Sequence, residues 1–273
     1  MSFSVLMSVY FKENPQFFDL ALESNLKQQT LPPDELVLVC DGPLTAELDT
    51  VIEKYQALYP ETLNVYRLES NVGLGKALNY GLAKCKFDLV ARSDSDDVCA
   101  PTRFEKQILF MESHPNVAVC SSDIAEFDTD PANPSRVKCM PREHAEIYKM
   151  AKFRNPINHM AAVFRKSVIE EVGSYMHLPY LEDYYLWLRV ICAGYELANI
   201  GEALVHARVG NGMAARRGNR KYISGWRTLS RYMLENNMIN RAEYCKNMIA
   251  VCAFIYTPTF LKEFLYKKVL RKV

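Results

Sequence analysis

The sequence predicts an α/β protein with a doubly wound, mostly parallel sheet and a helical C-terminal extension. In the first half of the chain, continuous apolar segments alternate with helical segments, which is the pattern of parallel strands buried on both faces. From about residue 219 the sequence is helical and amphipathic throughout. With 49% hydrophobic and 24% charged residues among 273, the composition excludes disordered, collagen-like and low-complexity proteins.

The first half of the chain supplies the elements of this sheet in order. Asn14 and Pro15 are typical of an N-cap and the first position of a helix. Strands are expected at 3–10, 35–40, 63–68 and 87–92, and helices at 15–29, 45–58 and from beyond Gly73 to about Cys85. A sheet of this kind binds its ligands at the carboxyl ends of the strands.

The second half is less regular. Short strands are expected at 117–120, 122–127, 135–139 and 161–164, with polar loops between them. A helix is expected to begin near Asp183, and the last helical segment, 260–273, mixes apolar residues with five cations. Because no apolar run is long enough to cross a bilayer, we expect a chain that does not span a membrane by itself.

Charge is divided unevenly along the chain. Residues 1–207 hold 19 Lys and Arg against 29 Asp and Glu, whereas residues 208–273 hold 14 against 3. A basic tail of this kind indicates an anionic partner, which could be a membrane surface, a phosphate-bearing substrate or nucleic acid. A solvated basic face or a helix packed on the core would give the same pattern.

An acidic cluster follows the strand expected at 87–92. Asp94, Asp96 and Asp97 lie within four residues of each other and repel one another unless a cation lies between them. Carboxylate oxygens suit Mg²⁺ and Mn²⁺, so the cluster indicates a divalent cation bound to a diphosphate. The alternative is a solvated acidic turn.

Two further acidic positions fall at element boundaries. Asp41 ends the strand expected at 35–40, where its carboxylate could accept the imide N–H of uracil; an Asp-Gly turn is the alternative. Glu182 and Asp183 lie where the helix expected near Asp183 begins. Asp183 could be a general base with Glu182 as its acidic neighbour, or the pair could be acids that cap the helix. The segment 71–76 also resembles a phosphate-binding loop but lacks the full glycine pattern.

Taken together, these motifs resemble the family 2 inverting glycosyltransferases, which have the GT-A fold. The resemblance covers residues 3–210 and rests on the opening strand 4–10, the strand ending at Asp41-Gly42, the segment 71–81, Asp94-Ser95-Asp96 with Asp97, and Glu182-Asp183. It is greatest to non-processive bacterial enzymes of O-antigen, capsule and exopolysaccharide assembly. The QxxRW motif of processive synthases is absent, which argues against a polymerase.

The resemblance implies a role for each matching position. Tyr10 would stack on uracil, Asp41 would hydrogen-bond it, and Lys76 would touch the nucleotide. Asp94 would hold the ribose or the metal, and Asp96 would coordinate Mn²⁺ or Mg²⁺. On the acceptor side, Asp183 would be the catalytic base with Glu182 beside it, and His206 is the candidate for an extra metal or diphosphate contact.

The resemblance also implies the reaction and its partners. A hexose or N-acetylhexosamine would move from a UDP-sugar to an undecaprenyl-diphosphate-linked saccharide, forming a β-glycosidic bond. Residues 1–97 would bind the nucleotide-sugar, 98–210 would bind the acceptor and carry catalysis, and 211–273 would form a basic helical extension on an anionic membrane surface. The enzyme would lie at the cytoplasmic face of the inner membrane and bind no nucleic acid.

Three alternatives compete with this interpretation. A sugar nucleotidyltransferase would need a Gly-rich basic loop after the first strand, where this chain has 10–15 without glycine. A non-catalytic nucleotide-sugar-binding protein would have no use for both acidic motifs. A nucleic-acid-binding module would bind RNA in a salt-dependent way through its basic tail.

Overall fold

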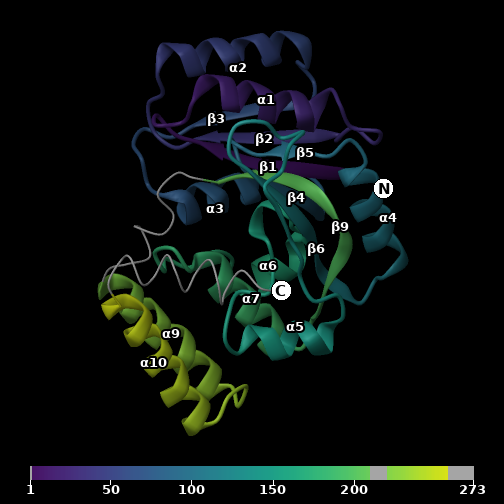
Figure 1. The fold of residues 1–273 in the computed structure, drawn as a ribbon. Helices are drawn as coiled ribbons and strands as arrows, with labels where there is room; N and C mark the ends of the chain where they lie inside the picture. The colour runs from purple at the N-terminus through teal and green to yellow at the C-terminus, as the bar shows by residue number, and fades with distance from the viewer. Residues whose placement is uncertain (1, 210–219, 258–273) are drawn as a thin grey trace.

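One mixed sheet forms the centre of the molecule (Figure 1). A computed structural model describes residues 2–209 and 220–257. The strands follow one another across the sheet in the order β3-β2-β1-β4-β8-β6-β9-β5, and β7 pairs with β6. The strands are β1 (Phe3–Val9), β2 (Glu35–Cys40), β3 (Leu63–Arg67), β4 (Leu89–Ser93), β5 (Val98–Cys99), β6 (Val117–Phe127), β7 (Arg136–Lys138), β8 (Val163–Arg165) and β9 (Glu196–Arg208).

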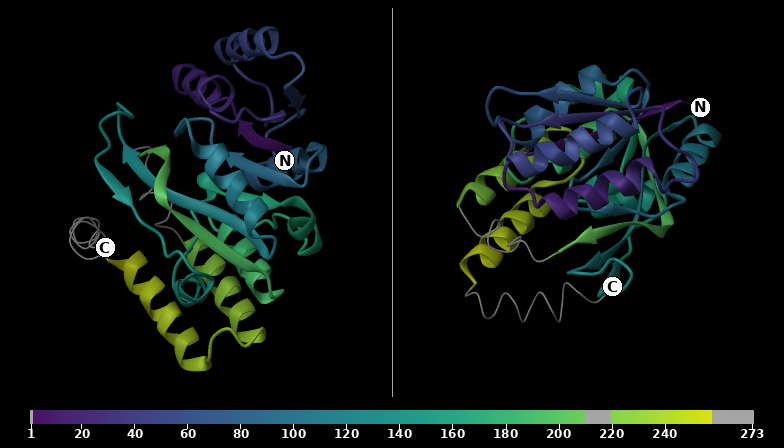
Figure 2. Two further views of the ribbon diagram at one scale, coloured as in Figure 1. Left: turned by 90° about the vertical axis from the view of Figure 1, so that its right-hand side faces the viewer. Right: turned by 90° about the horizontal axis from the view of Figure 1, so that it is seen from above.

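Helices cover both faces of this sheet (Figure 1; Figure 2). They are α1 (Pro15–Leu26), α2 (Ala46–Leu58), α3 (Leu74–Lys84), α4 (Arg103–Ser113), α5 (His144–Ala151), the 3₁₀ turn η1 (His159–Ala161), α6 (Lys166–Glu171), α7 (Glu182–Cys192), α9 (Arg220–Glu235) and α10 (Arg241–Tyr256). One face of β1 packs with α1, α2 and α4, while Leu6 faces α3 and α7 in a second core cluster. This confirms the predicted doubly wound α/β fold.

The first half of the sheet agrees closely with the sequence. β3, β2, β1 and β4 are all parallel, with Leu6 opposite Val37 on one side and Arg92 on the other. Asn14 caps α1 by accepting the backbone N–H groups of Gln16 and Phe17. The carboxyl ends of β1, β2 and β4 therefore come together at one edge.

The second half departs from the expected short strands. Residues 117–127 form the single strand β6 rather than two strands, because β6 pairs along its length with β9 and absorbs the irregularities as register shifts. The strand β9 was not expected from the sequence. The pair β6–β9 is parallel, whereas β8 runs antiparallel to both β4 and β6.

The described part of the C-terminal extension packs against the core. Trp226 and Leu229 of α9 and Val251 of α10 join the cluster that contains α7. At Gly225 a side chain would come within 2.8 Å of Leu181, so α9 lies directly against the start of α7. Within residues 2–209 and 220–257, no helix combines the length and apolar character needed to cross a membrane.

Two parts of the predicted basic tail lie outside the described residues: positions 210–219 and the last helix expected at 260–273.

Candidate active site

A cleft of about 810 Å³ opens at the carboxyl ends of β1, β2 and β4. Six of the predicted site residues line it: Tyr10, Asp41, Asp94, Asp96, Glu182 and Asp183. The predicted donor residues and the predicted base therefore line one cavity. The remaining lining residues are Ser8, Lys12, Glu13, Asn14, Phe17, Asn71, Gly73, Leu74, Arg92, Ser95, Asp97, His159, Met160, Tyr180 and Arg208.

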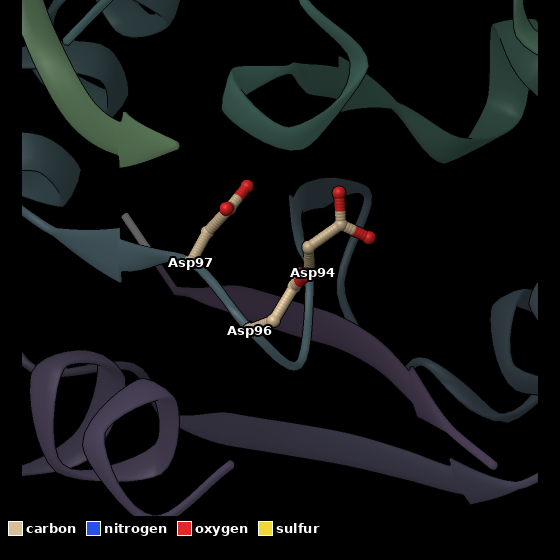
Figure 3. Close-up of side chains that lie close together, drawn as sticks. All are labelled: Asp94, Asp96 and Asp97. Atoms are coloured by element: carbon tan, nitrogen blue, oxygen red, sulfur yellow. The ribbon is translucent and has the colours of Figure 1, made fainter. Parts of the chain in front are cut away.

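The acidic loop 94–97 connects β4 to β5 (Figure 3). Carboxylate oxygens of Asp94, Asp96 and Asp97 all lie within 4.8 Å of one another. Asp97 is buried, and its Oδ1 accepts the backbone N–H of Arg208 at 2.7 Å. Such a convergence of hard oxygen ligands fits a divalent cation of the Mg²⁺ or Mn²⁺ type.

The charge state of this loop reflects its burial. Burial, together with the neighbouring Asp94 and Glu13, raises the pKa of Asp96 to about 7. Burial, Asp94 and Asp96 also hold the pKa of Asp97 well above its ordinary value. These three carboxylates are thus under mutual repulsion that a bound cation would relieve.

Asp41 is held rigidly at the end of β2. Its Oδ1 accepts the backbone N–H of Val72 at 2.7 Å, and its Oδ2 accepts the N–H of Gly73 at 3.1 Å and the side-chain amide of Asn71 at 3.0 Å. Gly42 follows with φ +89°, and any side chain there would come within 2.7 Å of the Asn71 nitrogen. A carboxylate has about four acceptor positions, so one remains for a ligand.

The loop after β1 brings an aromatic ring and a second carboxylate to the cleft. Tyr10 is 40% exposed and makes an edge-to-face contact with Phe11. Glu13 accepts the Ser95 hydroxyl at 2.7 Å, which ties this loop to the acidic loop. The turn that leads into the Asn14 cap also holds Tyr10, because the Glu13 N–H donates to the Tyr10 carbonyl at 3.0 Å.

Across the cleft, Glu182 and Asp183 occupy the first turn of α7. Asp183 accepts the side-chain N–H of Asn155 at 2.7 Å and the backbone N–H of Tyr184 at 2.7 Å. Burial raises the pKa of Glu182, and Asp183 adds to the effect. The N-terminal position predicted for this pair is confirmed, and it leaves both carboxylates facing the cavity.

Two predicted site residues lie outside this lining. Lys76 is exposed on α3, one turn beyond the cleft residue Gly73. His206 is half-buried on β9, opposite Val98 of β5, and its buried Nδ1 has no partner among the described residues. Their contacts with a nucleotide or a metal stay predictions.

Sequence reasoning missed two arginines and one histidine that line the cleft: Arg92, Arg208 and His159. Arg92 is buried, forms an ion pair with Asp94 and leaves Nε and Nη1 without a partner among the described residues. Arg208 lies between the rings of Phe17 and Phe127 and donates to the Asp96 carbonyl at 3.2 Å. Arg92 was visible as a charge inside an apolar strand, whereas only the fold brings Arg208 to the loop.

His159 and Tyr180 complete the second wall. His159 shares a hydrogen bond of 2.8 Å with the Tyr175 hydroxyl, and burial, with Arg92, holds its pKa well below the ordinary value. Tyr180 adopts a left-handed backbone with φ 69° just before α7. Strain of that kind gathers at functional sites.

The family model described as glycosyl transferase family 2 matches residues 4–173. The chain belongs to this family. It is 41% identical over 269 residues to the amylovoran biosynthesis glycosyltransferase AmsE of Erwinia amylovora, a match covering 97% of this chain and 98% of that protein. This family 2 chain is therefore a glycosyltransferase, as the motifs predicted.

A second relative and a solved structure extend the comparison. The Escherichia coli UDP-Gal:alpha-D-GlcNAc-diphosphoundecaprenol beta-1,3-galactosyltransferase is 38% identical over 272 residues, covering 99% of this chain and 97% of that protein. The crystal structure of Staphylococcus aureus TarS 1–349 in complex with UDP-GlcNAc aligns with a TM-score of 0.71 at 19% identity, over 98% of this chain and 76% of that one. This likeness confirms the GT-A fold of the family 2 domain.

Proposed function

We propose that this enzyme transfers a hexose or N-acetylhexosamine from a UDP-sugar to an undecaprenyl-diphosphate-linked saccharide. The transfer inverts the anomeric centre and forms a β-glycosidic bond during surface polysaccharide assembly. One observation carries the proposal: the acidic loop 94–97 and Asp183 line the same cleft. The names of the Escherichia coli and Erwinia relatives support the donor, the acceptor class and the pathway class.

The donor wall binds the nucleotide in this proposal. Tyr10 offers its exposed ring to the uracil face, and the free acceptor position of Asp41 takes the imide N–H. Asp94 and Asp96 hold Mn²⁺ or Mg²⁺, with Asp97 beside them. The bound cation supplies charge neutralisation for the UDP leaving group.

The second wall activates the acceptor. Asp183 takes the proton of the acceptor hydroxyl as that oxygen attacks the anomeric carbon, and UDP leaves from the opposite face. Asn155 orients one carboxylate oxygen through its 2.7 Å hydrogen bond. Glu182, whose pKa is raised by burial, lies on the acceptor side and receives a sugar hydroxyl. Residues 1–97 thus form the donor half and 98–210 the acceptor half.

The basic extension contacts the membrane surface in the same proposal. α9 and α10 pack on the core through one side, while Ile249 and Tyr256 of α10 stay exposed. Residues 208–273 hold 14 cations against 3 carboxylates, so an anionic bilayer at the cytoplasmic face of the inner membrane is the matching surface. Cosedimentation with anionic vesicles but not with zwitterionic vesicles tests this contact.

The test of the reaction has a binding arm and a transfer arm. UDP is titrated into the protein by calorimetry, first with Mn²⁺ and then with EDTA, and we expect binding that depends on the metal. UDP-Glc, UDP-Gal and their N-acetyl forms are then offered with a synthetic lipid-diphosphate sugar, and the product linkage is assigned by NMR. Binding of GDP or dTDP in place of UDP, or an α-linked product, would contradict the proposal.

A further inference from the structure

Arg103 is a buried cation behind the acidic loop. It is the first residue of α4, it is fully buried, and it does not line the cleft. Its guanidinium donates through Nη2 to the Arg92 carbonyl at 2.6 Å and through Nη1 to the Ser93 hydroxyl at 2.8 Å and to Cys99 Sγ at 3.0 Å. None of these acceptors is a carboxylate.

These acceptors lie at both ends of the acidic loop. Arg92 and Ser93 are the last two residues of β4, which enters the loop, and Cys99 belongs to β5, which leaves it. One planar fork therefore closes the base of the loop that carries Asp94, Asp96 and Asp97. The same base is tied to α1, since Ser93 donates to the Asn25 side chain at 2.8 Å.

The bond to Gln107 extends the connection to the other wall. Arg103 Nε donates to Gln107 Oε1 at 3.1 Å, and Gln107 Nε2 donates to the Ala161 carbonyl at 2.8 Å. Ala161 ends the turn η1, whose first residue, His159, lines the cleft. Arg103 and Gln107 thus fix the acidic loop relative to the acceptor side.

Among residues 2–209 and 220–257, no carboxylate forms an ion pair with the Arg103 guanidinium. Burying a guanidinium in this way is costly, and an apolar side chain would fill the same volume without that cost. The gain from Arg103 is geometric, because one side chain donates to four acceptors on three different segments. Lysine keeps the charge, but its three N–H donors share one nitrogen and cannot reproduce the planar fork.

We propose that Arg103 is the positioning residue of the acidic loop: it sets the spacing of Asp94, Asp96 and Asp97 and thereby the affinity for a divalent cation with a nucleoside diphosphate. The inference rests on the proposed donor site. Arg103 itself touches neither the nucleotide nor the cation. Its influence passes through the backbone of the loop ends.

The test compares Arg103→Lys with a matched control, Arg189→Lys. Arg189 is also buried and donates to two backbone carbonyls, those of Val172 and Ser174, but it lies toward the far end of α7. Calorimetry measures UDP binding with Mn²⁺ and with EDTA, electron paramagnetic resonance measures free Mn²⁺, and circular dichroism follows folding. For Arg103→Lys we expect Mn²⁺-dependent UDP affinity to fall about 10–100-fold while UDP binding in EDTA is unchanged.

The control fixes the meaning of each outcome. Arg189→Lys is expected to lower the melting temperature but to keep the wild-type affinity for Mn²⁺ and UDP, and excess Mn²⁺ is expected to restore binding to Arg103→Lys. Wild-type affinity in Arg103→Lys, or an equal loss with and without metal, would overturn the positioning role alone. A wild-type protein that binds no UDP with Mn²⁺ would instead overturn the proposed function.

A milder variant keeps the inference testable if Arg103→Lys does not fold. Cys99→Ala removes one acceptor of the fork and retains the arginine. We expect the same metal-dependent loss at a few-fold, about the value of one hydrogen bond. No loss in this variant would count against the fork as the positioning device.

Discussion

The two walls of the cleft are built in different ways. On the donor wall, Tyr10, Asp41 and the acidic loop each follow directly after a parallel strand, so chain order alone brings them to one edge. On the acceptor wall, Asp183 opens a helix and His159 lies in a 3₁₀ turn, and contacts between distant segments place both. The proposed donor wall is thus placed mainly by chain order and the proposed acceptor wall by long-range packing, and each prediction below tests that division.

The largest effect is expected at Asp183. Asp183→Asn removes the proposed base, so transfer should fall about 10³-fold while UDP affinity stays near the wild-type value. Single-turnover transfer and calorimetry measure the two quantities. Asn155→Ala, which removes one orienting hydrogen bond, should give a smaller loss in transfer of about tenfold. A parallel loss of UDP binding in Asp183→Asn would show that Asp183 also contributes to donor binding, and would refute the division between the two walls.

The next effect is expected on the donor wall. Asp96→Ala should weaken Mn²⁺-dependent UDP binding by roughly a hundredfold, because a cation ligand is lost, and should leave UDP binding in EDTA unchanged. Asp88→Asn is the matched control, since Asp88 precedes the same strand at its opposite end and accepts the Ser167 N–H. Unchanged Mn²⁺-dependent binding in Asp96→Ala would reject Asp96 as a ligand.

A smaller effect, independent of metal, is expected at Asp41. Asp41→Asn loses one of two acceptor oxygens and sets an amide group against the Val72 or Gly73 N–H. UDP affinity should fall about tenfold both with Mn²⁺ and with EDTA. Asp34→Asn is the control, because Asp34 accepts the Phe3 N–H at the amino end of the neighbouring strands. A loss confined to the Mn²⁺ titration would show that Asp41 contacts the cation rather than the uracil ring.

The smallest effect is a pH dependence of stability on the acceptor wall. His159 stays neutral in the folded state because burial, with Arg92, lowers its pKa, while the unfolded chain binds a proton below about pH 6.5. The free energy of unfolding should therefore fall below that pH, by at most about 1.4 kcal/mol per unit.

Variants of two histidines isolate this contribution. His159→Gln should flatten the change in melting temperature between about pH 7.5 and 5.5, since the proton-binding group is gone. His114→Gln, at an exposed histidine, should keep the wild-type profile. An identical slope in all three proteins would show that His159 is protonated in the folded state.

The sequence determined the elements of the donor wall. Continuous apolar segments located β1 to β4 to within a few residues, and the position of Asp41 and Asp94 after those strands was enough to place them at one edge. It also located Glu182 and Asp183 at a helix start. Each of these inferences depends on neighbours in the chain, which is why a single sequence could support them.

The tertiary structure decided which distant groups complete the site. The strand β9 is stable through its long pairing with β6, and that pairing brings Arg208 to the acidic loop from more than a hundred positions away in sequence. Arg103 lies only 4 to 11 positions from its acceptors, but the strands on either side of the loop have to fold back before those acceptors come within hydrogen-bond distance. Hydrogen bonds and ion pairs of this kind depend on distances in space, and residue patterns along the chain carry no record of those distances.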